Sequence, residues 1–465
     1  MSVTERAIGA RLDRLPIWPY RRIVLVLVGV AYFFAYFEGV NLGVALPGAL
    51  EAFDASLTVG ATIVSITFWG AIVGSLLSGY VCDRWGRRNG IITAVLLVGV
   101  GSVLTAISTG VVMFTAMRFV AVVGGAAATT AIATYMSEIA PAGRRGRSMA
   151  WSVIPAMLGF ASVPFIGLAL VPAFDNGWRM VLMVPAIGTL VFLVGYRWLP
   201  ESPRWLAARG RAAEADRIVA DAEAHVRATV PGQLPPVDPP QAAMLDAGAD
   251  GGRWRELVRA PHLRWTALFS LIWFGIQIPI KTVMGMGVTL LTEAGFDITT
   301  SISLTIGMSV GVVGGALVAL AVTDRWPRKY PVMAIAAACG SMLVVMGFHP
   351  TNLLIVLAFG GIGAFIGMSA PLLHLLTAEH FPTRIRSRGC GLVSTIGDLG
   401  GIAGPWVALG AAAVGGFSGT WIVMGALFLS LCVPLTMTRN TTRASLEETA
   451  AERIDDPADL QPRPT

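Results

Sequence analysis

The sequence has few charged residues and few cysteines. Charged side chains make up 13% of its 465 residues and hydrophobic side chains 55%, whereas a soluble domain carries roughly 25% charged residues. This shortage of charge excludes a soluble globular protein and predicts a chain that is integral to a membrane. The four cysteines, Cys82, Cys339, Cys390 and Cys432, fall in or beside predicted helices. They lie away from the external loops, where a disulfide could form.

The sequence also lacks the constellations that carry enzyme chemistry. It contains no nucleotide-binding loop, no cluster of metal ligands and no arrangement of a nucleophile with a base. We therefore expect no enzymatic activity, no metal and no cofactor. The first apolar stretch is too long for a cleavable signal peptide and has no small-residue cleavage site.

Twelve long apolar stretches are present, each close to the roughly 20 residues that cross a bilayer core. They cover about residues 22–46, 58–81, 90–109, 111–134, 148–171, 179–198, 265–291, 300–322, 331–348, 352–378, 389–414 and 418–437. Six precede and six follow a polar segment. The sequence thus predicts an all-α membrane protein with twelve transmembrane helices in two six-helix halves.

Five segments follow from this pattern. They are an N-terminal tail (1–21), an N-terminal six-helix bundle (22–198), a central loop with short helices (199–264), a C-terminal six-helix bundle (265–437) and a disordered tail (438–465). In the central loop, Ser202 can cap a helix that starts at Pro203. The proline-rich stretch 231–240 is typical of a linker.

Basic residues are concentrated in every second connecting segment. With the N-terminus inside, 31 of the 34 basic residues fall in segments predicted to be cytoplasmic. The opposite loops carry acids, namely Glu51, Asp54, Asp175, Glu293 and Asp297. Because basic flanks set orientation, we expect both termini in the cytoplasm. Topology explains the net charge of +6, so that charge gives no reason to expect nucleic acid as a partner.

Two short motifs occur twice at one spacing of 241 residues. Gly79-Tyr-Val-Cys-Asp83-Arg84-Trp85-Gly86-Arg87-Arg88 is followed by Asp324-Arg325-Trp326-Pro327-Arg328-Lys329. In the same register, Glu138-x-x-Pro141-x-x-x-Arg145 is followed by Glu379-x-x-Pro382-x-x-x-Arg386. Two motifs that keep one register indicate that the chain is a tandem repeat of two similar halves.

The motif G-x-x-x-D-R-x-G-R-R between helices 2 and 3, with its weaker copy between helices 8 and 9, resembles the major facilitator superfamily. The resemblance covers about residues 20–437. It implies a transporter in which two halves rock about a midplane site to give alternating access. Tyr135-x-x-Glu138-x-x-Pro141-x-x-x-Arg145-Gly146 and Pro200-Glu201-Ser202-Pro203-Arg204 resemble the sugar-porter-like and organic-anion branches.

By this resemblance, charged residues at the cytoplasmic ends of the helices form a gate. Asp83 and Glu138 can pair with arginines and hold that face shut, and exposed pairs worth roughly 0–1 kcal/mol each are easily broken. The alternative is that these arginines only fix topology. The predicted gate residues are Asp83, Arg84, Arg87, Arg88, Glu138, Arg145, Asp324, Arg325, Glu379, Arg386 and Arg388.

Four charges lie inside predicted spans, where each is costly and marks a functional site. They are Glu38, Arg118, Lys281 and Asp398, and none recurs at the 241-residue spacing. Glu38 and Arg118 both fall roughly 10–12 Å below the outer surface, at 1.5 Å per residue, so they can pair. A carboxylate that alternately pairs and takes up a proton can couple transport to protons. The alternative is a static buried pair.

Lys281 is the leading candidate for contact with an anionic solute, and a structural partner for an acid is the alternative. It lies near Gln277 and Pro279, in a helix interrupted by proline and glycine that can line a cavity. The estimated depth of Asp398 argues against a direct bridge to Lys281.

Further polar residues complete the predicted site. Asn41 is one turn from Glu38 and can share its face, whereas His374 is placed at the membrane interface. We predict that the solute contacts Asn41, Arg118, Gln277, Lys281 and Asp398, and that the coupling proton involves Glu38 and Arg118.

The first helix carries a more specific resemblance. In Phe37-Glu38-Gly-Val-Asn-Leu-Gly43-Val-Ala-Leu-Pro47, an acid is followed by Gly at five and Pro at nine residues, as in the aromatic acid:proton symporter family and its metabolite:proton relatives. Arg118 also sits where those carriers have an arginine. Two positions depart from the pattern, because Ala35 replaces a second acid and Asp398 replaces a basic residue. Because of these departures, a neutral or zwitterionic solute remains an alternative.

Other branches fit the residues less well. Hexose porters show paired glutamines in helix 7, but Gln277 stands alone, and the helix 10 tryptophan is absent. Drug antiporters carry Gly-Pro-x-x-Gly-Gly in helix 5, which 148–171 lacks. A transporter-like sensor would need an output domain, for which these tails are short and polar.

The sequence thus predicts proton-coupled uptake of a small organic or aromatic acid through a bacterial inner membrane, by a monomeric carrier. The alternative is symport of a sugar, a polyol or another neutral metabolite. Drug efflux and a non-transporting sensor rank below both.

Overall fold

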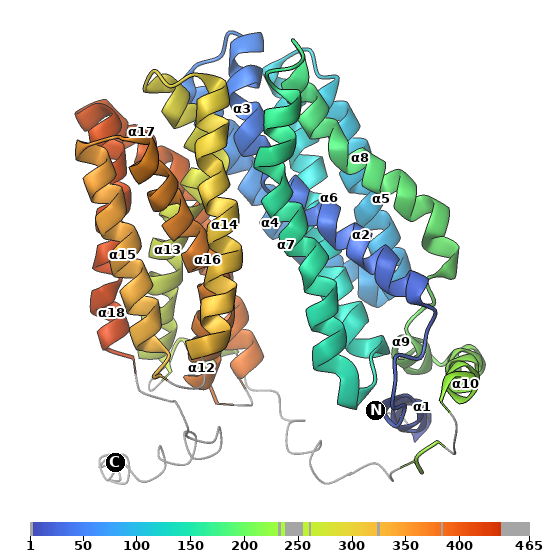
Figure 1. Cartoon of the computed structure of the whole chain (residues 1–465). Coiled ribbons are helices and arrows are strands. Elements are labelled where there is room, and N and C mark those ends of the chain that lie inside the picture. Colours follow the sequence, from blue (N-terminus) through green and yellow to red (C-terminus); the bar gives the residue numbers. More distant parts are fainter. Residues whose placement is uncertain are drawn as a thin grey trace, which may run out of the picture. The chain divides into compact units, whose positions relative to one another are not determined.

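The computed structural model describes residues 3–230, 234–237, 254–259, 262–322, 326–382 and 385–438. Within these ranges every regular element is a helix (Figure 1). The chain divides into two compact units. Unit 1 comprises Met1–Leu245 and Met284–Ser303, and unit 2 comprises Asp246–Val283 and Leu304–Thr465.

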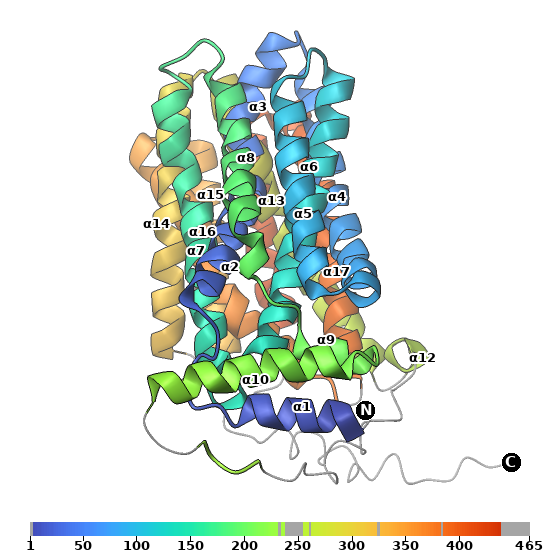
Figure 2. The same cartoon turned by 90° about the vertical axis from the view of Figure 1, so that its right-hand side faces the viewer.

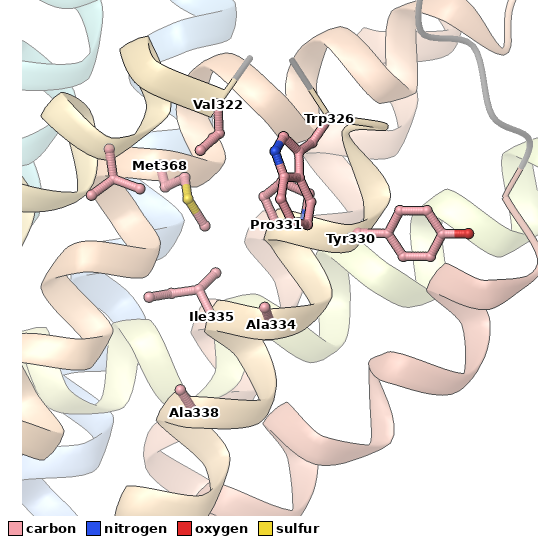
Figure 3. Close-up of a pocket in the computed structure, with 9 residues that line it drawn as sticks. Val322, Trp326, Tyr330, Pro331, Ala334, Ile335, Ala338 and Met368 are labelled. Atoms are coloured by element: carbon pink, nitrogen blue, oxygen red, sulfur yellow. The ribbon is translucent and has the colours of Figure 1, made fainter. Parts of the chain in front are cut away.

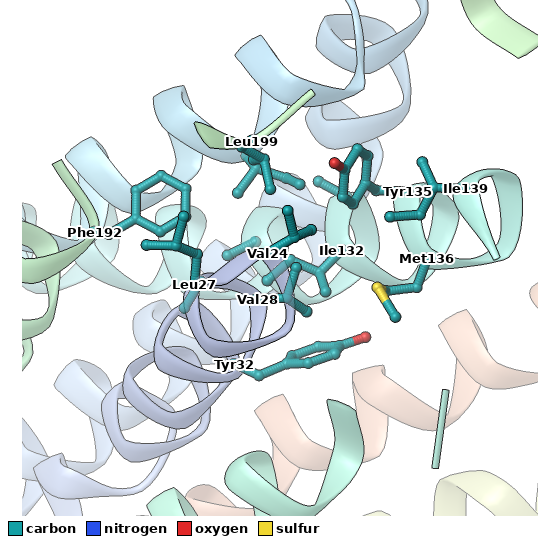
Figure 4. Packing of buried hydrophobic residues seen from close by; sticks show 14 of the residues in the cluster. Val24, Leu27, Val28, Tyr32, Ile132, Tyr135, Met136, Ile139, Phe192 and Leu199 are labelled. Carbon is teal, nitrogen blue, oxygen red and sulfur yellow. The ribbon is translucent and has the colours of Figure 1, made fainter. Parts of the chain in front are cut away.

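The long helices of unit 1 are apolar, and all but the first two are individually of membrane-spanning length. They are α2 (Arg22–Glu38), α3 (Asn41–Ala52), α4 (Leu57–Trp85), α5 (Arg87–Ala106), α6 (Val111–Ile139), α7 (Arg145–Leu170) and α8 (Gly177–Gly195). Helices α2 and α3 together form one broken span, bent by 42°. The core of the unit is apolar where α2 packs on α6, with Val24, Val28, Ile132 and Tyr135 buried (Figure 4).

The break between α2 and α3 falls beside a predicted functional residue. Pro47, inside α3, has no N–H to donate to the preceding turn. Val40, in the break, has φ −124° and ψ −24°, outside helical values. A broken helix leaves backbone groups without helical partners, which is tolerated in a membrane where other groups satisfy them. Arg118 does so here, since its Nη2 donates to the carbonyl oxygen of Glu38 at 2.5 Å.

Unit 2 contains the second set of spans. They are α13 (Leu263–Glu293), whose last part belongs to unit 1, α14 (Ile298–Val322), whose first part belongs to unit 1, α15 (Lys329–Phe348), α16 (Asn352–Glu379) and α17 (Arg386–Ser430). The short α12 (Trp254–Leu257) precedes them and the short α18 (Cys432–Thr436) follows them. The stretch Arg386–Thr436 has 51 residues, far more than the roughly 20 that one crossing needs. It turns back at Gly416, whose φ of 58° favours glycine. Thr420 therefore lies beside Ala408, to whose carbonyl its hydroxyl donates.

Small residues let the helices of each unit approach closely, as is common in membranes. In unit 1, a Cβ at Gly74 of α4 would lie 2.3 Å from the carbonyl oxygen of Val123 in α6. In unit 2, a Cβ at Gly315 of α14 would lie 2.0 Å from the carbonyl oxygen of Ala364 in α16.

Short helices cover one end of unit 1, namely α1 (Val3–Asp13), α9 (Pro203–Ala208) and α10 (Ala212–Thr229) (Figure 2). Ser202 caps α9 as predicted, because its Oγ accepts from the N–H of Trp205 at 3.2 Å. Helix α1, which the sequence did not predict within the N-terminal tail, packs on this layer through buried Ile8 and Leu12. Arg11 and Arg14 both donate to the carboxylate of Glu223 in α10.

Candidate functional site

Glu38 and Arg118, which the sequence placed at one depth, form an ion pair in unit 1. Nη1 of Arg118 meets Oε1 of Glu38, and the side chains are 1% and 0% exposed. Arg118 comes from α6, and Glu38 is the last residue of α2, directly before the break. Because the guanidinium also holds the Glu38 carbonyl, the broken helix positions this pair.

Two neutral donors complete the shell of Glu38. Asn41 Nδ2 donates to Oε2 at 3.0 Å, and Ser102 Oγ of α5 donates to the same oxygen at 3.2 Å. Sequence reasoning found Asn41 by its spacing along the helix but missed Ser102, for which spacing gives no signal. Among the described residues, Asn41 Oδ1 and Arg118 Nε are buried without a hydrogen-bond partner. Each can therefore take one more hydrogen bond.

The cluster is balanced in charge, and protonation would disturb that balance. If Glu38 binds a proton, Arg118 loses its counter-ion in a region closed to water. An uncompensated buried charge is strongly unfavourable. Protonation of Glu38 can therefore favour a rearrangement of the cluster. No solute could reach Arg118 in this structure, because the side chain is buried.

A second polar cluster lies in unit 2, where α13 packs on the glycine-rich α17. Gln277 Nε2 donates to Oδ1 of Asp398 at 3.1 Å, and both residues are partly exposed. The stem of Lys281 lies against Gly401, at which a Cβ would stand 2.7 Å from Lys281 Cγ. Gln277 and Lys281 share one face of α13, being four residues apart. The structure thus gathers the three predicted solute contacts of this unit on the α13–α17 contact.

Two aromatic rings extend this face by one further turn. Trp273, four residues before Gln277, lies edge-on to the ring of His374, with centroids 4.5 Å apart. Its indole Nε1 donates to Thr377 Oγ1 at 3.1 Å. His374, which the sequence placed at the membrane interface, keeps an exposed side chain beside this ring. Sequence reasoning missed Trp273, because an aromatic residue in an apolar helix carries no signal of its own.

The repeated motifs place one ion pair in each half. Arg87 Nη2 meets Glu138 Oε1 at 2.8 Å in unit 1, and Arg328 pairs with Glu379 in unit 2. Both pairs span 51 residues, and each member lies 241 residues from its counterpart. Arg328 was not among the predicted gate residues, although the 241-residue spacing applied to Arg87 would have found it. Asp324 and Arg325 lie outside the described residues.

In unit 1, both predicted gate acids pair with a predicted gate arginine. Asp83 meets Arg87 Nη1 at 3.0 Å, so Asp83 and Glu138 share Arg87. Arg145 meets Asp13 of α1 at 3.4 Å instead of a gate acid.

The remaining predicted gate arginines contact backbone or lie near the surface. Arg386 Nε donates to the carbonyl of Ala378 at 3.0 Å, and Arg88 Nη2 reaches the Tyr196 carbonyl at 3.5 Å. Arg84 is exposed at the end of α4, and Arg388 is half-buried in the first turn of α17.

Glu201 joins the first motif to the central loop. Its Oε1 accepts from the backbone N–H groups of Arg87, Arg88 and Ser202 at 2.9, 3.1 and 2.8 Å. A carboxylate is favoured at a helix N-terminus such as that of α5. Burial nevertheless raises the pKa of Glu201 above its ordinary value. Gly86 is required here, because its φ is 101° and a Cβ would stand 2.2 Å from Glu201 Oε2.

Comparison with a protein family gives a match over most of the chain. Residues 28–405, and again residues 280–463, match the family model described as Major Facilitator Superfamily.

Three curated relatives share this length. A metabolite transport protein of Bacillus subtilis (YyaJ) is 28% identical over 85% of this chain and 86% of its own. The niacin transporter NiaP of Acinetobacter baylyi is 25% identical over 86% and 89%. The arabinose-proton symporter of Bacillus subtilis is 25% identical over 71% and 73%.

The fold has counterparts among solved structures. A D-xylose-proton symporter superposes with a TM-score of 0.70 at 17% identity, covering 91% of this chain and 99% of that one. This likeness confirms the predicted all-helical membrane fold with twelve spans in two halves. In the described part of the chain, ten helices are long and apolar enough to cross a membrane, the bent α2–α3 pair adds one span, and the turn at Gly416 divides another in two.

Proposed function

Because the chain belongs to the Major Facilitator Superfamily and is a multi-pass membrane transporter rather than an enzyme, we propose that it couples uptake of a small organic acid to protons. The observation that carries this proposal is the closed pair of Glu38 and Arg118. A carboxylate inside a membrane marks a functional site by default, and this one has a cation, two neutral donors and a helix break around it.

The proposed proton step takes place at Glu38. Protonation of its carboxylate leaves Arg118 without a counter-ion, which the buried site tolerates poorly. A state in which water or an anionic group contacts the guanidinium and compensates its charge is then favoured. Alternating access between such states would carry the proton with the solute. Asn41 Oδ1 and Arg118 Nε, each able to take a further hydrogen bond, are the atoms that would accommodate the change.

The proposed solute contacts lie on the face formed by Trp273, Gln277, Lys281 and Asp398. A cationic ammonium and an amide beside an aromatic ring suit a carboxylate on a small, flat molecule. Niacin, which one relative is named for transporting, is an aromatic carboxylic acid. We therefore place an organic or aromatic acid first among the solute classes.

A sugar or polyol is the second candidate, and a specific contact favours it. The hydrogen bond between Gln277 and Asp398 sets donors and acceptors side by side, as binding of hydroxyl groups requires. The arabinose-proton symporter among the relatives supports the same class. In either case we propose a monomer in a bacterial inner membrane, with both termini in the cytoplasm.

Uptake into proteoliposomes under an imposed pH gradient tests the proposal. With an alkaline interior, we expect labelled nicotinate or benzoate to accumulate and a protonophore to abolish the accumulation. Accumulation of xylose or a polyol instead would support the second candidate. If neither acids nor sugars respond to the gradient, the proposal of proton coupling is wrong.

A further inference from the structure

A groove runs between α14, α15 and α16 near one end of unit 2. Its volume is about 520 Å³. The lining side chains are apolar apart from the indole N–H of Trp326 and the hydroxyl of Tyr330. They are Val318, Val322, Trp326, Tyr330, Pro331, Ala334, Ile335, Ala338 and Met368. Figure 3 shows Val322 and Met368 on one side, with Ile335, Ala334 and Trp326 opposite. All nine residues lie in unit 2, outside the polar face described above.

The two halves of the repeat differ at one lining position of this groove. The position equivalent to Pro331, 241 residues earlier, is Gly90. A Cβ at Gly90 would lie 2.3 Å from Cys82 Sγ, so α5 can pack against α4 only because that residue has no side chain. Pro331 carries a ring at the equivalent place, where it lines the groove together with Ile335 and Met368.

The groove lies at the ends of two membrane-spanning helices. Val322 ends α14 and Lys329 begins α15, so the groove opens where these two spans leave the membrane. Trp326 and Tyr330 at this opening are 60% and 47% exposed. Tryptophan and tyrosine are enriched at this level of a bilayer, because their rings are apolar and carry a polar atom.

A positive charge lies beside Tyr330, one of the residues that line the groove. Lys329 Nζ lies 5.4 Å from the centre of the Tyr330 ring and donates to the carbonyl of Thr438 at 3.1 Å. Among the described residues, both of these contacts are with neutral groups, whereas the neighbouring Arg328 is neutralised by Glu379. The ammonium charge is therefore able to attract an anion at headgroup level.

We propose that this groove binds one acyl chain of an anionic phospholipid, whose phosphate group contacts Lys329. The apolar lining takes the chain, the exposed rings flank the glycerol region, and the ammonium group selects a negative headgroup. Basic pockets between membrane helices recognise anionic headgroups in this way. The site is distinct from the proton and solute clusters and does not depend on which solute is carried.

Native mass spectrometry of the purified carrier, titrated with phosphatidylglycerol and with zwitterionic phosphatidylcholine, tests the site. Ala338→Trp should fill the groove and remove the most tightly held phosphatidylglycerol. Pro331→Gly, which removes the proline ring from the apolar lining, should weaken the same binding. Leu320→Trp is the matched control, since Leu320 is exposed on α14 and does not line the groove. It should bind lipid as the wild type does.

Lys329→Ala tests the headgroup contact separately. One basic residue near a membrane surface contributes about a fivefold preference for anionic lipid. We expect Lys329→Ala to lower phosphatidylglycerol affinity by about that factor and to leave phosphatidylcholine affinity unchanged. The proposal is overturned if Ala338→Trp and Pro331→Gly both retain the lipid, if Leu320→Trp loses it equally, or if Lys329→Ala has no effect on the preference.

Discussion

The two polar clusters within the membrane spans differ in how far they are open. The Glu38–Arg118 pair is 0–1% exposed and has each charge matched, whereas Gln277 and Asp398 remain partly exposed. A carboxylate in a closed, balanced pair can bind a proton, but it cannot contact a solute and so cannot distinguish one solute from another. An open face can contact a solute, but its charges are screened more strongly. The difference supports a division of labour, with proton coupling in unit 1 and solute recognition in unit 2.

The largest expected effect is on the stability of the fold, and it distinguishes the Glu38–Arg118 pair from the open cluster. Arg118→Ala leaves the Glu38 carboxylate buried without a counter-ion, and breaking a buried pair in this way costs about 3–5 kcal/mol. We expect a large fall in the thermal unfolding midpoint in detergent. The double variant Glu38→Gln/Arg118→Met removes both charges and should recover most of that loss. Equal stability of the single and double variants would contradict the account.

The open cluster should respond in affinity rather than in stability. Gln277→Ala removes an amide, and Asp398→Asn removes a charge, from the proposed solute-binding face, where a hydrogen bond to a charged group is worth about 1.5–3 kcal/mol. We therefore expect KM for the solute to rise about tenfold or more, with the unfolding midpoint nearly unchanged. Concentration-dependent uptake measures this, with Thr395→Ala on the exposed side of α17 as a control. If Asp398→Asn abolishes gradient coupling while KM stays constant, the division of labour is wrong.

A smaller effect distinguishes the two copies of the repeated motif. Gly86→Ala forces a side chain into a backbone with φ 101° and against Glu201 Oε2, and such strain costs of order 1–3 kcal/mol. The equivalent residue in the second copy is Pro327, and Pro327→Ala should change stability by less than about 0.5 kcal/mol. Thermal unfolding of the two variants compares them directly. A Pro327→Ala variant as unstable as Gly86→Ala would show that the two copies do not differ as described.

The smallest effect concerns the helical layer of unit 1. Burial would raise the pKa of Glu223, but hydrogen bonds from Arg11 and Arg14 outweigh it and hold that pKa below its ordinary value. This contribution to stability is present above the ordinary glutamate pKa of about 4.3 and is lost as pH falls through the lowered pKa.

Hydrogen exchange of α1 reports this effect. Protection should decrease at acid pH in the wild type, whereas Glu223→Gln should lower it at neutral pH and remove most of its dependence on pH. Glu214→Gln, on the same helix but exposed, is the control and should behave as the wild type. If Glu223→Gln keeps full protection at neutral pH, the carboxylate does not anchor α1.

Much of this fold could be predicted, because apolar spans, basic flanks and a repeat can each be recognised in the linear sequence without knowledge of packing. Equal depth was enough to bring Glu38 and Arg118 together, since both helices cross the same bilayer. Ser102 was missed because its contact with Glu38 depends on the orientation of α5 about its own axis. The role of Gly86 and the groove at Pro331 were missed for a related reason. They depend on the distance between neighbouring helices, which only packing determines.

Proton movement that accompanies the solute tests the central claim most directly. Proteoliposomes in weak buffer should make the external medium alkaline when the solute is added, as each solute enters with a proton. Glu38→Gln carries no titratable group at this position, so it should show no such change while still exchanging labelled for unlabelled solute. Glu293→Gln, an exposed carboxylate outside both clusters, should behave as the wild type. Undiminished proton uptake by Glu38→Gln would contradict the assignment of Glu38 as the proton carrier.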